Sequence, residues 1–319
     1  MMSDVNRAGY RSLSDPDLLE EFRQDCELQD MTAETITRYV SCISIFYDFI
    51  VQRGISLVHV EREMLKEFLR YLREERKVKP KTIENYFSAL SSFYAYLEFE
   101  GYLVKNPILA TRKRYLKRYK RGEGNNSERK LISVEEMKML INSILDMRDK
   151  AIVTLLAKSG IRREELIGID VDDIDWLERS ITLKPKRKRT NRIIYFDDET
   201  ARILRRWLRL RGQREPKTEA LFIGEHGERL QRNGVYTVVT KHAQRLGLHN
   251  PDSDKMEDHF SPHCCRHWFT THLRRAGMKR EFIQELRGDR RRDAIDIYDH
   301  IDKEELKEAY LAHIPQLGI

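Results

Sequence analysis

The sequence predicts a mostly α-helical protein that carries one small antiparallel β-sheet and folds as two domains. Apolar residues recur every three to four positions through most of the chain, which is the spacing of amphipathic helices. One stretch, residues 179–196, instead alternates apolar and basic residues around a turn, as a β-hairpin does. The length of 319 residues fits about two domains of roughly 100–200 residues each.

Four helices are expected in residues 13–109, which we interpret as a small helical-bundle domain. The first begins after Ser14, a favourable N-cap residue, and the second begins after Thr32. Two further apolar stripes, over residues 64–72 and 81–101, predict the third and fourth helices. The last stripe is rich in aromatic side chains, and its helical spacing indicates that these rings form core rather than a base-stacking surface.

A basic segment at residues 110–130 is interpreted as the interdomain linker, and residues 1–12 are expected to be a flexible N-terminus. Seven of the eleven residues from Thr111 to Arg121 are Lys or Arg. Such a run is either a solvated segment or a nucleic-acid contact, and the run alone does not decide between them. The linker cations that we single out as candidate DNA contacts are Arg112, Lys113, Arg114 and Lys117.

The second domain, residues 131–319, opens with a capping box that runs from Ser133 to Glu136. A buried helix of sequence DKAIVTLLAKSG is expected to end at Gly160, and a short helix follows it. The hairpin at residues 179–196 comes next and has a strongly basic tip. The remaining helices are expected at residues 198–212, 232–246, 262–276, 279–288 and 303–312.

The composition excludes several classes of protein. The chain holds 59 Lys and Arg against 52 Asp and Glu, a net charge of +7 that suits contact with a polyanion without proving it. No stretch approaches the roughly 18 uncharged apolar residues of a membrane span, and the N-terminus has no apolar signal-peptide region. Four cysteines are too few and too oddly placed for a disulfide framework. We expect a soluble, cytoplasmic protein.

Two basic patterns carry candidate chemistry. In SGIRREEL, Arg162 follows the helix end at Gly160, where its guanidinium and nearby backbone N–H groups can face an anion; the alternative is an ordinary surface arginine. The hairpin tip is either a ribbon that enters a nucleic-acid groove or a charged soluble turn. Its basic residues are Lys184, Lys186, Arg187, Lys188 and Arg189.

Two patterns near the C-terminus add an imidazole, a guanidinium and a phenol. In HCCRHWFTTHLRRAG, His263 and Arg266 are three residues apart and share a helix face. Neighbouring histidines raise the question of a metal site, but no carboxylate or second ligand pair has zinc-site spacing, so no metal is expected. Tyr298 stands in a polar segment and is uninformative by itself.

Taken in order, these patterns resemble the tyrosine recombinase (phage integrase) family, especially its Xer-like and archaeal members. SGIRREEL resembles the family's arginine turn, and His263-Cys-Cys-Arg266 resembles its HxxR box. Tyr298 lies nine residues after Asp289, as the family's nucleophile follows its "LGH" position. The resemblance spans roughly residues 131–305. It implies a SAM-like core-binding domain before the linker and a catalytic domain after it.

The resemblance implies a site-specific recombinase that needs no cofactor. Tyr298 would attack a phosphodiester and form a 3′-phosphotyrosyl intermediate, with strand exchange through a Holliday junction. Arg162 and Arg266 would clamp the non-bridging phosphate oxygens, and His263 would exchange a proton. Lys186 would protonate the leaving 5′ hydroxyl, although Lys184 and Lys188 are alternatives.

One residue departs from the family pattern. The family's His or Trp at the "LGH" position is Asp289 here, and an ionised carboxylate cannot donate a hydrogen bond to phosphate. Either Asp289 points away from the phosphate and orients His263 or an arginine, or its pKa is raised, or the position is less demanding in this subgroup. We favour the orienting role.

The implied partners are double-stranded DNA and further copies of this chain. Two DNA sites require four protomers, so a tetramer on DNA is expected. The apolar stripe on the terminal helix, Leu306, Tyr310 and Leu311, is expected to dock on a neighbouring protomer, with docking in its own domain as the alternative.

Two other functions are compatible with the same residues. A type IB topoisomerase-like enzyme would use tyrosine cleavage to relax supercoils without joining two sites. A DNA-binding regulator would have lost catalysis, and Asp289 is the sequence feature that favours it. A metal-dependent nuclease lacks its ligands.

Overall fold

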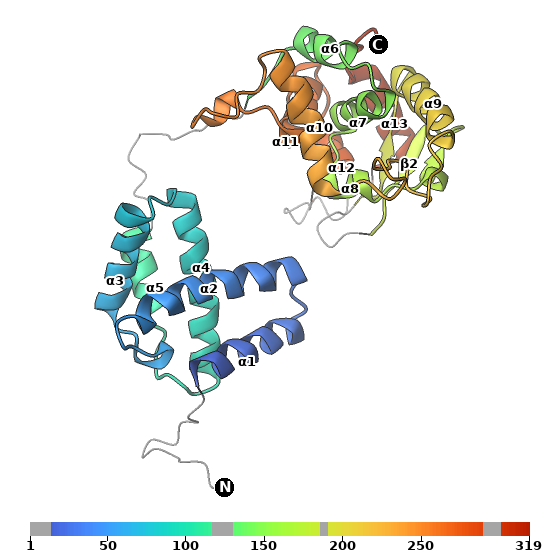
Figure 1. Ribbon diagram of the computed structural model, residues 1–319. Helices are drawn as coiled ribbons and strands as arrows, with labels where there is room; N and C mark the ends of the chain where they lie inside the picture. The colour runs from blue at the N-terminus through green and yellow to red at the C-terminus, as the bar shows by residue number, and fades with distance from the viewer. Residues whose placement is uncertain (1–13, 117–129, 186–190, 290–300) are drawn as a thin grey trace. The chain divides into compact units, whose positions relative to one another are not determined.

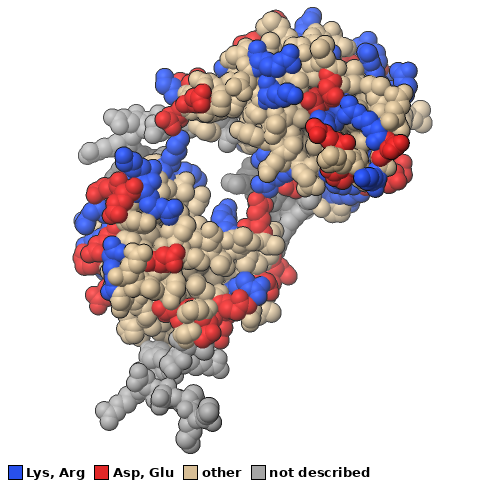
Figure 2. Space-filling model, viewed as in Figure 1, with Lys and Arg blue, Asp and Glu red and all other residues tan. Residues whose placement is uncertain are grey.

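The computed structural model describes residues 14–116, 130–185, 191–289 and 301–319 (Figure 1). These residues are mostly helical and include one three-stranded antiparallel sheet, so the predicted fold class is confirmed. The chain divides into two compact units, residues 1–123 and 124–319, and each is described by itself. Within the described residues, every helix is too short or too polar to span a lipid bilayer. Lys and Arg side chains are spread over both units (Figure 2).

The N-terminal unit is a helical bundle whose helices begin where the sequence predicts. Ser14 and Thr32 cap the first two, because their side chains accept the backbone N–H groups of Asp17 and Thr35. The α-helices are α1 (Asp15–Leu28), α2 (Ala33–Val51), α3 (Arg62–Arg70), α4 (Pro80–Phe99) and α5 (Ile108–Thr111), and shorter turns of helix are η1 (Leu57–His59), η2 (Tyr71–Glu75) and η3 (Arg112–Leu116).

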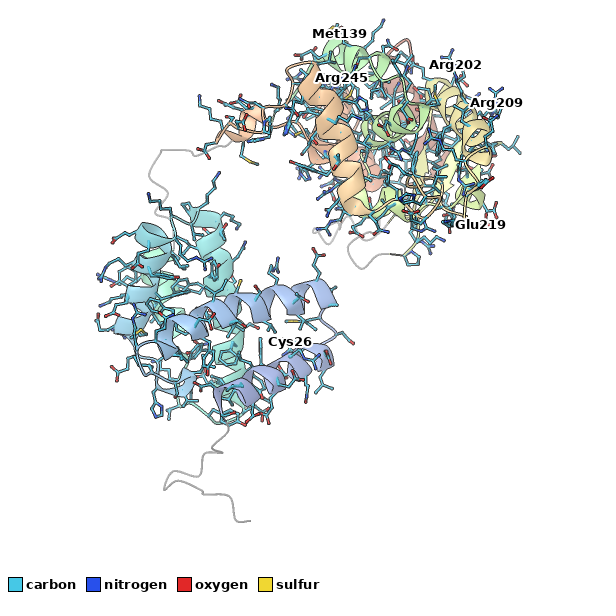
Figure 3. All side chains as sticks on the ribbon, in the orientation of Figure 1. Cys26, Met139, Arg202, Arg209, Glu219 and Arg245 are labelled. Carbon is cyan, nitrogen blue, oxygen red and sulfur yellow. The ribbon has the colours of Figure 1, made fainter. Side chains whose placement is uncertain are left out.

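The aromatic stripes of this unit form its core. Phe46 and Phe68 are fully buried and their ring centroids lie 4.8 Å apart. Phe87 and Phe93 of α4 are also fully buried. Cys26 lies between α1 and α2 (Figure 3), and like the other cysteines it is a free thiol. Because these rings are inside the bundle, they are not available to stack on bases.

Helical structure continues past residue 110, where the sequence analysis places the start of the linker. The η3 turn extends to Leu116, and Thr111 is buried. Arg112 donates from Nη1 to Ser91 Oγ and from Nη2 to Ser88 Oγ, both at 3.1 Å. The first basic residues of the segment are therefore part of the bundle, because Arg112 is fixed to the serines of α4.

The C-terminal unit surrounds one buried helix. The helices are α6 (Val134–Asn142), α7 (Met147–Ser159), α8 (Arg163–Ile167), α9 (Asp198–Gly212), α10 (Arg232–Arg245), α11 (Pro262–Arg275), α12 (Arg280–Arg287) and α13 (Lys303–His313), with short turns η4 (Val171–Asp173) and η5 (Met256–Asp258). Every α7 residue from Ala151 to Ser159 is buried. The α7 helix packs against both α9 and α11 and lies between them in Figure 1.

The predicted hairpin forms two strands of the sheet. The strands are β1 (Ile174–Asp175), β2 (Ser180–Thr182) and β3 (Ile193–Tyr195), in that order. Ile181 pairs with Ile174 on one side and Ile194 on the other, so buried isoleucines fix the register. The tip, residues 186–190, lies outside the described residues.

The start of this unit is attached to α11. Ser133 and Glu136 form the predicted capping box at the start of α6. Trp268 Nε1 donates to the carbonyl of Ser133 at 3.2 Å, and His272 Nε2 lies 3.1 Å from the carbonyl oxygen of Ile132. These two contacts join the first residues of the C-terminal unit to α11, the helix that carries His263 and Arg266.

The terminal helix α13 docks on its own chain, which corrects the expectation that its stripe is buried on a neighbour. Leu306 and Tyr310 are buried in a cluster that includes Phe269 of α11 and Ile283 of α12. Tyr310 Oη donates to the carbonyl of Lys158 at 3.0 Å. The stripe does require burial, as its amphipathic pattern indicates, and α11 and α12 supply the apolar surface within the same unit.

Candidate active site

A glycine turn between α7 and α8 positions the first candidate arginine. Gly160 ends α7 in the left-handed conformation, at φ +60°. A Cβ at this position would lie 2.4 Å from Phe269 Cδ1, so only glycine fits both the conformation and the space. The chain then reverses and places Arg162 at the N-cap of α8.

Glu165 fixes Arg162 at this helix start. The backbone N–H of Arg162 donates to Glu165 Oε2 at 2.7 Å, and its Nη1 donates to Oε1 at 2.9 Å. Glu165 is buried, whereas the Arg162 side chain is 37% exposed. One carboxylate therefore holds the arginine by backbone and side chain, with part of the guanidinium left at the surface.

Arg266 approaches from α11 and is almost completely buried, at 4% exposure. Its Nη1 donates to the carbonyl of Gly160 at 2.7 Å, and its Nη2 donates to the carbonyl of Arg287 at 3.1 Å. Burial lowers the pKa of Arg266 to about 10, and the charges of Arg162 and Arg287 act in the same direction. The guanidinium is still charged at neutral pH, with two main-chain carbonyls holding its orientation.

Asp289 joins the two arginines. Its Oδ1 accepts from Arg162 Nη2 at 3.1 Å and from Arg266 Nη2 at 2.8 Å. Its Oδ2 lies 3.1 Å from Arg287 Nε. Gly288 ends α12 in the left-handed conformation at φ +61°, which directs Asp289 toward the arginines. One carboxylate oxygen thus sits between two guanidiniums that come from distant parts of the chain.

Three of the sequence-predicted residues line one pocket. The pocket has a volume of about 240 Å³ and is bounded by Arg162, His263 and Arg266, together with Arg163 and Arg232 among others. His263 is exposed in the first turn of α11. The lining is dominated by cations, so the pocket is suited to an anionic group. Across the described residues, no cluster of His, Cys, Asp and Glu is placed to hold a metal ion.

The other candidates lie apart from this pocket or outside the described residues. Lys184 forms an ion pair with Asp170, which also pairs with Arg229 at 2.5 Å. The hydrogen bond that Lys184 donates to the Asp170 carboxylate raises the pKa of Lys184. The residues that lie outside the described ranges are Lys117, Lys186, Arg187, Lys188, Arg189 and Tyr298.

The linker candidates that are described belong to the N-terminal unit. Arg112 and Lys113 line a second basic pocket of about 370 Å³, with Lys81 and Ser88 of α4 on its walls. Arg114 is exposed beside it.

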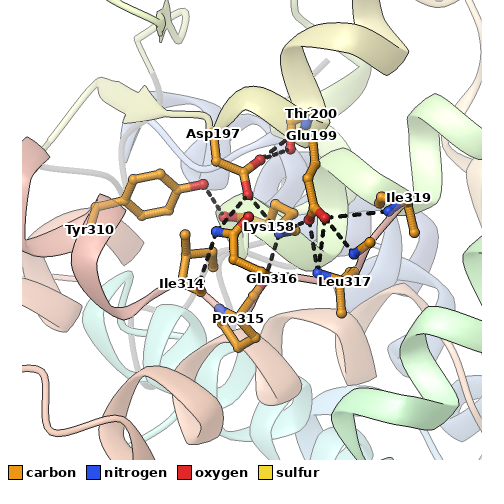
Figure 4. A network of polar contacts seen from close by, with 11 residues as sticks. Lys158, Asp197, Glu199, Thr200, Tyr310, Ile314, Pro315, Gln316, Leu317 and Ile319 are labelled. Atoms are coloured by element: carbon orange, nitrogen blue, oxygen red, sulfur yellow. Dashed lines mark hydrogen bonds and ion pairs between the residues drawn. The ribbon is translucent and has the colours of Figure 1, made fainter.

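Sequence reasoning did not identify a buried ion network in the same unit as the arginine pair (Figure 4). Lys158 is fully buried and donates from Nζ to Asp197 Oδ2 at 2.6 Å, to Glu199 Oε2 at 2.7 Å and to the carbonyl of Pro315 at 2.6 Å. Glu199 Oε2 also accepts the backbone N–H of Leu317 at 2.9 Å. A single lysine within the apolar run IVTLLAKS was the sequence feature that could have indicated it.

Sequence reasoning also missed the partners that hold the site. It matched Glu165 to the family pattern without its contact to Arg162, and it assigned nothing to Arg287 or Arg232. These contacts join residues far apart in sequence, and only the fold brings them together.

Comparison with known proteins identifies the family. Residues 130–305, more than half of the chain, match the phage integrase family, and residues 18–100 match the phage integrase N-terminal SAM-like domain. The tyrosine recombinase XerC of Herpetosiphon aurantiacus is 31% identical over 285 residues, which cover 86% of this chain and 87% of the relative. XerC of Haemophilus influenzae (strain PittEE) is 27% identical over 291 residues, covering 88% and 91%.

Solved structures share the fold. The XerH site-specific recombinase bound to its difH substrate superposes with a TM-score of 0.64 at 20% identity, covering 93% of this chain and 84% of that one. A lambda integrase dimer bound to a COC′ core site gives a TM-score of 0.65 at 17% identity, covering 92% and 80%. The chain belongs to the phage integrase family and is a tyrosine recombinase of the Xer-like type, a DNA-binding enzyme of site-specific recombination that cleaves and rejoins DNA through a tyrosine.

Proposed function

We propose that the pocket beside Arg162 and Arg266 binds the scissile phosphate of a recombination site in double-stranded DNA. The observation that supports this most directly is the single Asp289 oxygen within hydrogen-bond distance of both guanidiniums. Two forked donors that converge on one anionic oxygen are arranged as a phosphate requires. Both arginines have more N–H groups than these contacts use, so donors are left for a second anion.

In the proposed reaction, Tyr298 attacks the phosphorus and the bond from phosphorus to the 5′ oxygen breaks. His263 takes the phenol proton, and Lys186 gives a proton to the leaving 5′ oxygen. The DNA is then joined to Tyr298 through a 3′-phosphotyrosyl bond. The phosphodiester energy stays in that bond, so a 5′ hydroxyl of a partner duplex can reverse the step, and a Holliday junction is the intermediate of exchange.

The two arginines would stabilise the negative charge that grows on the non-bridging oxygens in the transition state. Arg266 is suited to this because burial removes competing water, and Arg162 because part of its guanidinium is exposed at the pocket.

Asp289 is proposed as a positioning residue for this pair. Three guanidiniums near one another repel, and a carboxylate between them offsets that repulsion while fixing the orientation of two of them. Asp289 contacts both Arg162 and Arg266, so these arginines are the groups that we propose it orients. Asp289 stands where the family has His or Trp, but its carboxylate cannot donate a hydrogen bond to phosphate as those side chains can.

Among the hairpin lysines, Lys186 is the proposed general acid. Lys184 is paired with Asp170, and that ion pair would have to break before Lys184 could deliver a proton to DNA. Because two DNA sites require four active protomers, we also propose a tetramer on DNA. Because the α13 stripe is buried in its own unit, we do not assign the contacts of that assembly to it.

Trapping of the covalent intermediate tests the proposal. Nicked duplex fragments of the host genome are incubated with the full chain in EDTA, and protein–DNA adducts are isolated and their ends sequenced. We expect an adduct at one recurrent sequence with the unaltered protein and with Tyr115→Phe, which removes an exposed tyrosine of the N-terminal unit. Tyr298→Phe is expected to abolish it. An adduct that persists in Tyr298→Phe, or tight DNA binding without any adduct, would overturn the proposed role.

Substitution of Asp289 shows whether its carboxylate mainly orients the two arginines or mainly repels the DNA phosphate. In Asp289→Ala the arginines keep their charge but lose the group that orients them, so we expect DNA to bind at least as tightly while the adduct forms about tenfold more slowly. An Asp289→His variant tests whether a donor at this position restores the rate. Adduct formation by Asp289→Ala at an equal or higher rate would contradict a positioning role.

A further inference from the structure

The outer face of α9 carries a row of arginines that the proposed reaction does not use. Arg202, Arg206 and Arg209 are all exposed, and their spacing of four and then three residues places them on one side of the helix. The opposite side of α9 is buried against the domain core through Leu204 and Trp207. In Figure 3, Arg202 and Arg209 point outward from α9 at the edge of the unit. We call these three residues the α9 arginine stripe.

The positive charge of the stripe is not balanced within the described part of the chain. No hydrogen bond or ion pair among the described residues joins Arg202, Arg206 or Arg209 to a carboxylate, whereas Arg214 just beyond α9 pairs with Asp146 at 3.0 Å. Lys150 of α7 adds a further cation nearby: burial lowers its pKa, and the charge of Arg206 acts in the same direction. Like charges gathered this closely are stabilised when an anion binds.

The stripe lies away from the arginine pocket. The residues that line the pocket come from the α7–α8 turn and from the starts of α10 and α11. The α7 helix separates α9 from α11, with α9 at the far edge in Figure 1. In Figure 2 this edge of the unit carries basic side chains with acidic ones among them. A duplex held at the pocket therefore leaves the stripe open to a separate segment.

The spacing of the stripe fits a phosphate backbone better than a protein surface. Seven residues of helix place Arg202 and Arg209 about 10 Å apart, and one DNA strand carries a phosphate roughly every 3.4 Å of duplex axis. Arginine forks bind phosphate oxygens well. A protein partner would need a buried apolar anchor, and beside these arginines α9 offers only Leu210, which is 38% exposed, and the half-buried Leu208.

We propose that the α9 arginine stripe binds the phosphate backbone of a second duplex DNA segment, separate from the duplex held at the arginine pocket. Because it rests on surface arginines alone, this proposal does not depend on the roles assigned to Tyr298, Lys186 or Asp289.

A bridging assay tests it with the full chain. The protein is bound to an immobilised duplex, excess protein is removed, and retention of a second, fluorescent duplex is measured over a range of salt concentrations. The test variant replaces Arg202, Arg206 and Arg209 with Gln. The matched control replaces Arg274, Arg275 and Arg280 with Gln, which removes the same charge from exposed positions at the end of α11 and the start of α12. Melting temperature and affinity for the immobilised duplex confirm that both variants fold.

The stripe variant is expected to retain the second duplex at least about tenfold less well than the control variant or the unaltered protein. Each phosphate contact contributes about 0.9 to the slope of log K against log salt, so that slope should fall by about 2 to 3. Equal retention by both triple variants, or no second duplex retained by the unaltered protein, overturns the proposal. If an oligoglutamate peptide binds in a stripe-dependent way and the second duplex does not, the stripe serves an acidic protein and the DNA assignment is wrong.

Discussion

The C-terminal unit holds two charged clusters that differ in the balance between cations and carboxylates. In the Lys158 network one cation serves two carboxylates and a main-chain carbonyl, and Lys158 is fully buried. In the arginine cluster, Asp289 contacts Arg162, Arg266 and Arg287, and Glu165 contacts Arg162 as well. Arg162 and Arg266 both line a pocket. The first cluster is closed, so its contacts can only stabilise the fold. The second has an excess of cations beside an opening, which is the arrangement that an anionic ligand needs.

Lys158→Met tests the closed cluster and should have the largest effect on stability. It leaves Asp197 and Glu199 buried without their cation, which lowers the free energy of unfolding by about 3–5 kcal/mol. Urea unfolding measures the change. Lys150→Met, on the same helix but without a carboxylate partner among the described residues, should cost less than about 1 kcal/mol. A Lys158→Met variant as stable as Lys150→Met would show that the network is not a stabilising element.

Arg266→Lys tests the open cluster. Lysine keeps a charge but cannot hold Gly160, Asp289 and a phosphate at once, because it lacks the planar fork. We expect covalent adduct formation to fall by about 10² to 10³, or roughly 2.7–4 kcal/mol in the barrier. The adduct rate and the melting temperature are measured together, and a large loss of rate with a small change in melting temperature is the expected result. Loss of both in proportion would indicate that Arg266 is chiefly structural.

Gly160→Ala should lower both the stability and the rate of adduct formation, because Gly160 ends α7 and its carbonyl accepts a hydrogen bond from Arg266. The left-handed conformation costs about 1–2 kcal/mol with a Cβ, and the clash with Phe269 adds about 1–3 kcal/mol. Gly247→Ala is the matched control: it has φ +68° and no atom within 4 Å of the added Cβ. The difference between the two free energies of unfolding isolates the Phe269 contact. Equal values would mean that the ring moves aside without cost.

The pH dependence of unfolding gives the smallest expected effect. Burial alone would raise the pKa values of Asp197 and Glu199, but the charge of Lys158 and its hydrogen bonds lower both below their ordinary values of 3.8 and 4.5. Carboxylates with lowered pKa values contribute stability above their unfolded pKa, and lose it as pH falls through the folded pKa. Unfolding followed by circular dichroism should show stability falling below about pH 4. Glu199→Gln should flatten that fall, and an unchanged profile would contradict the assignment.

Local rules predicted most of the helices but few of the contacts between them. Ser14, Thr32 and Ser133 begin helices because a capping side chain acts on neighbours in sequence. Gly160 ends α7 for an equally local reason. The pattern on α13 indicated that Leu306 and Tyr310 need burial, yet periodicity says nothing about which chain supplies the partner surface.

In the candidate site, too, the sequence predicted the residues but not the contacts between them. Its residues were identified from motif order, and the structure brings Arg162, His263 and Arg266 to one pocket. The contact between Arg162 and Asp289 joins positions 127 residues apart, and no local pattern encodes that separation. The Lys158 network was missed for a similar reason, because its partners come from α9 and the C-terminal segment.

The attachment of α11 to the carbonyls of Ile132 and Ser133 has a mechanical consequence. These carbonyls stand where the backbone enters the C-terminal unit, so a pull on the chain at Leu131 loads α11 through Trp268 and His272. Both lie within about two turns of Arg266 on that helix. Tension along the polypeptide would therefore be transmitted through α11 to the guanidinium of Arg266.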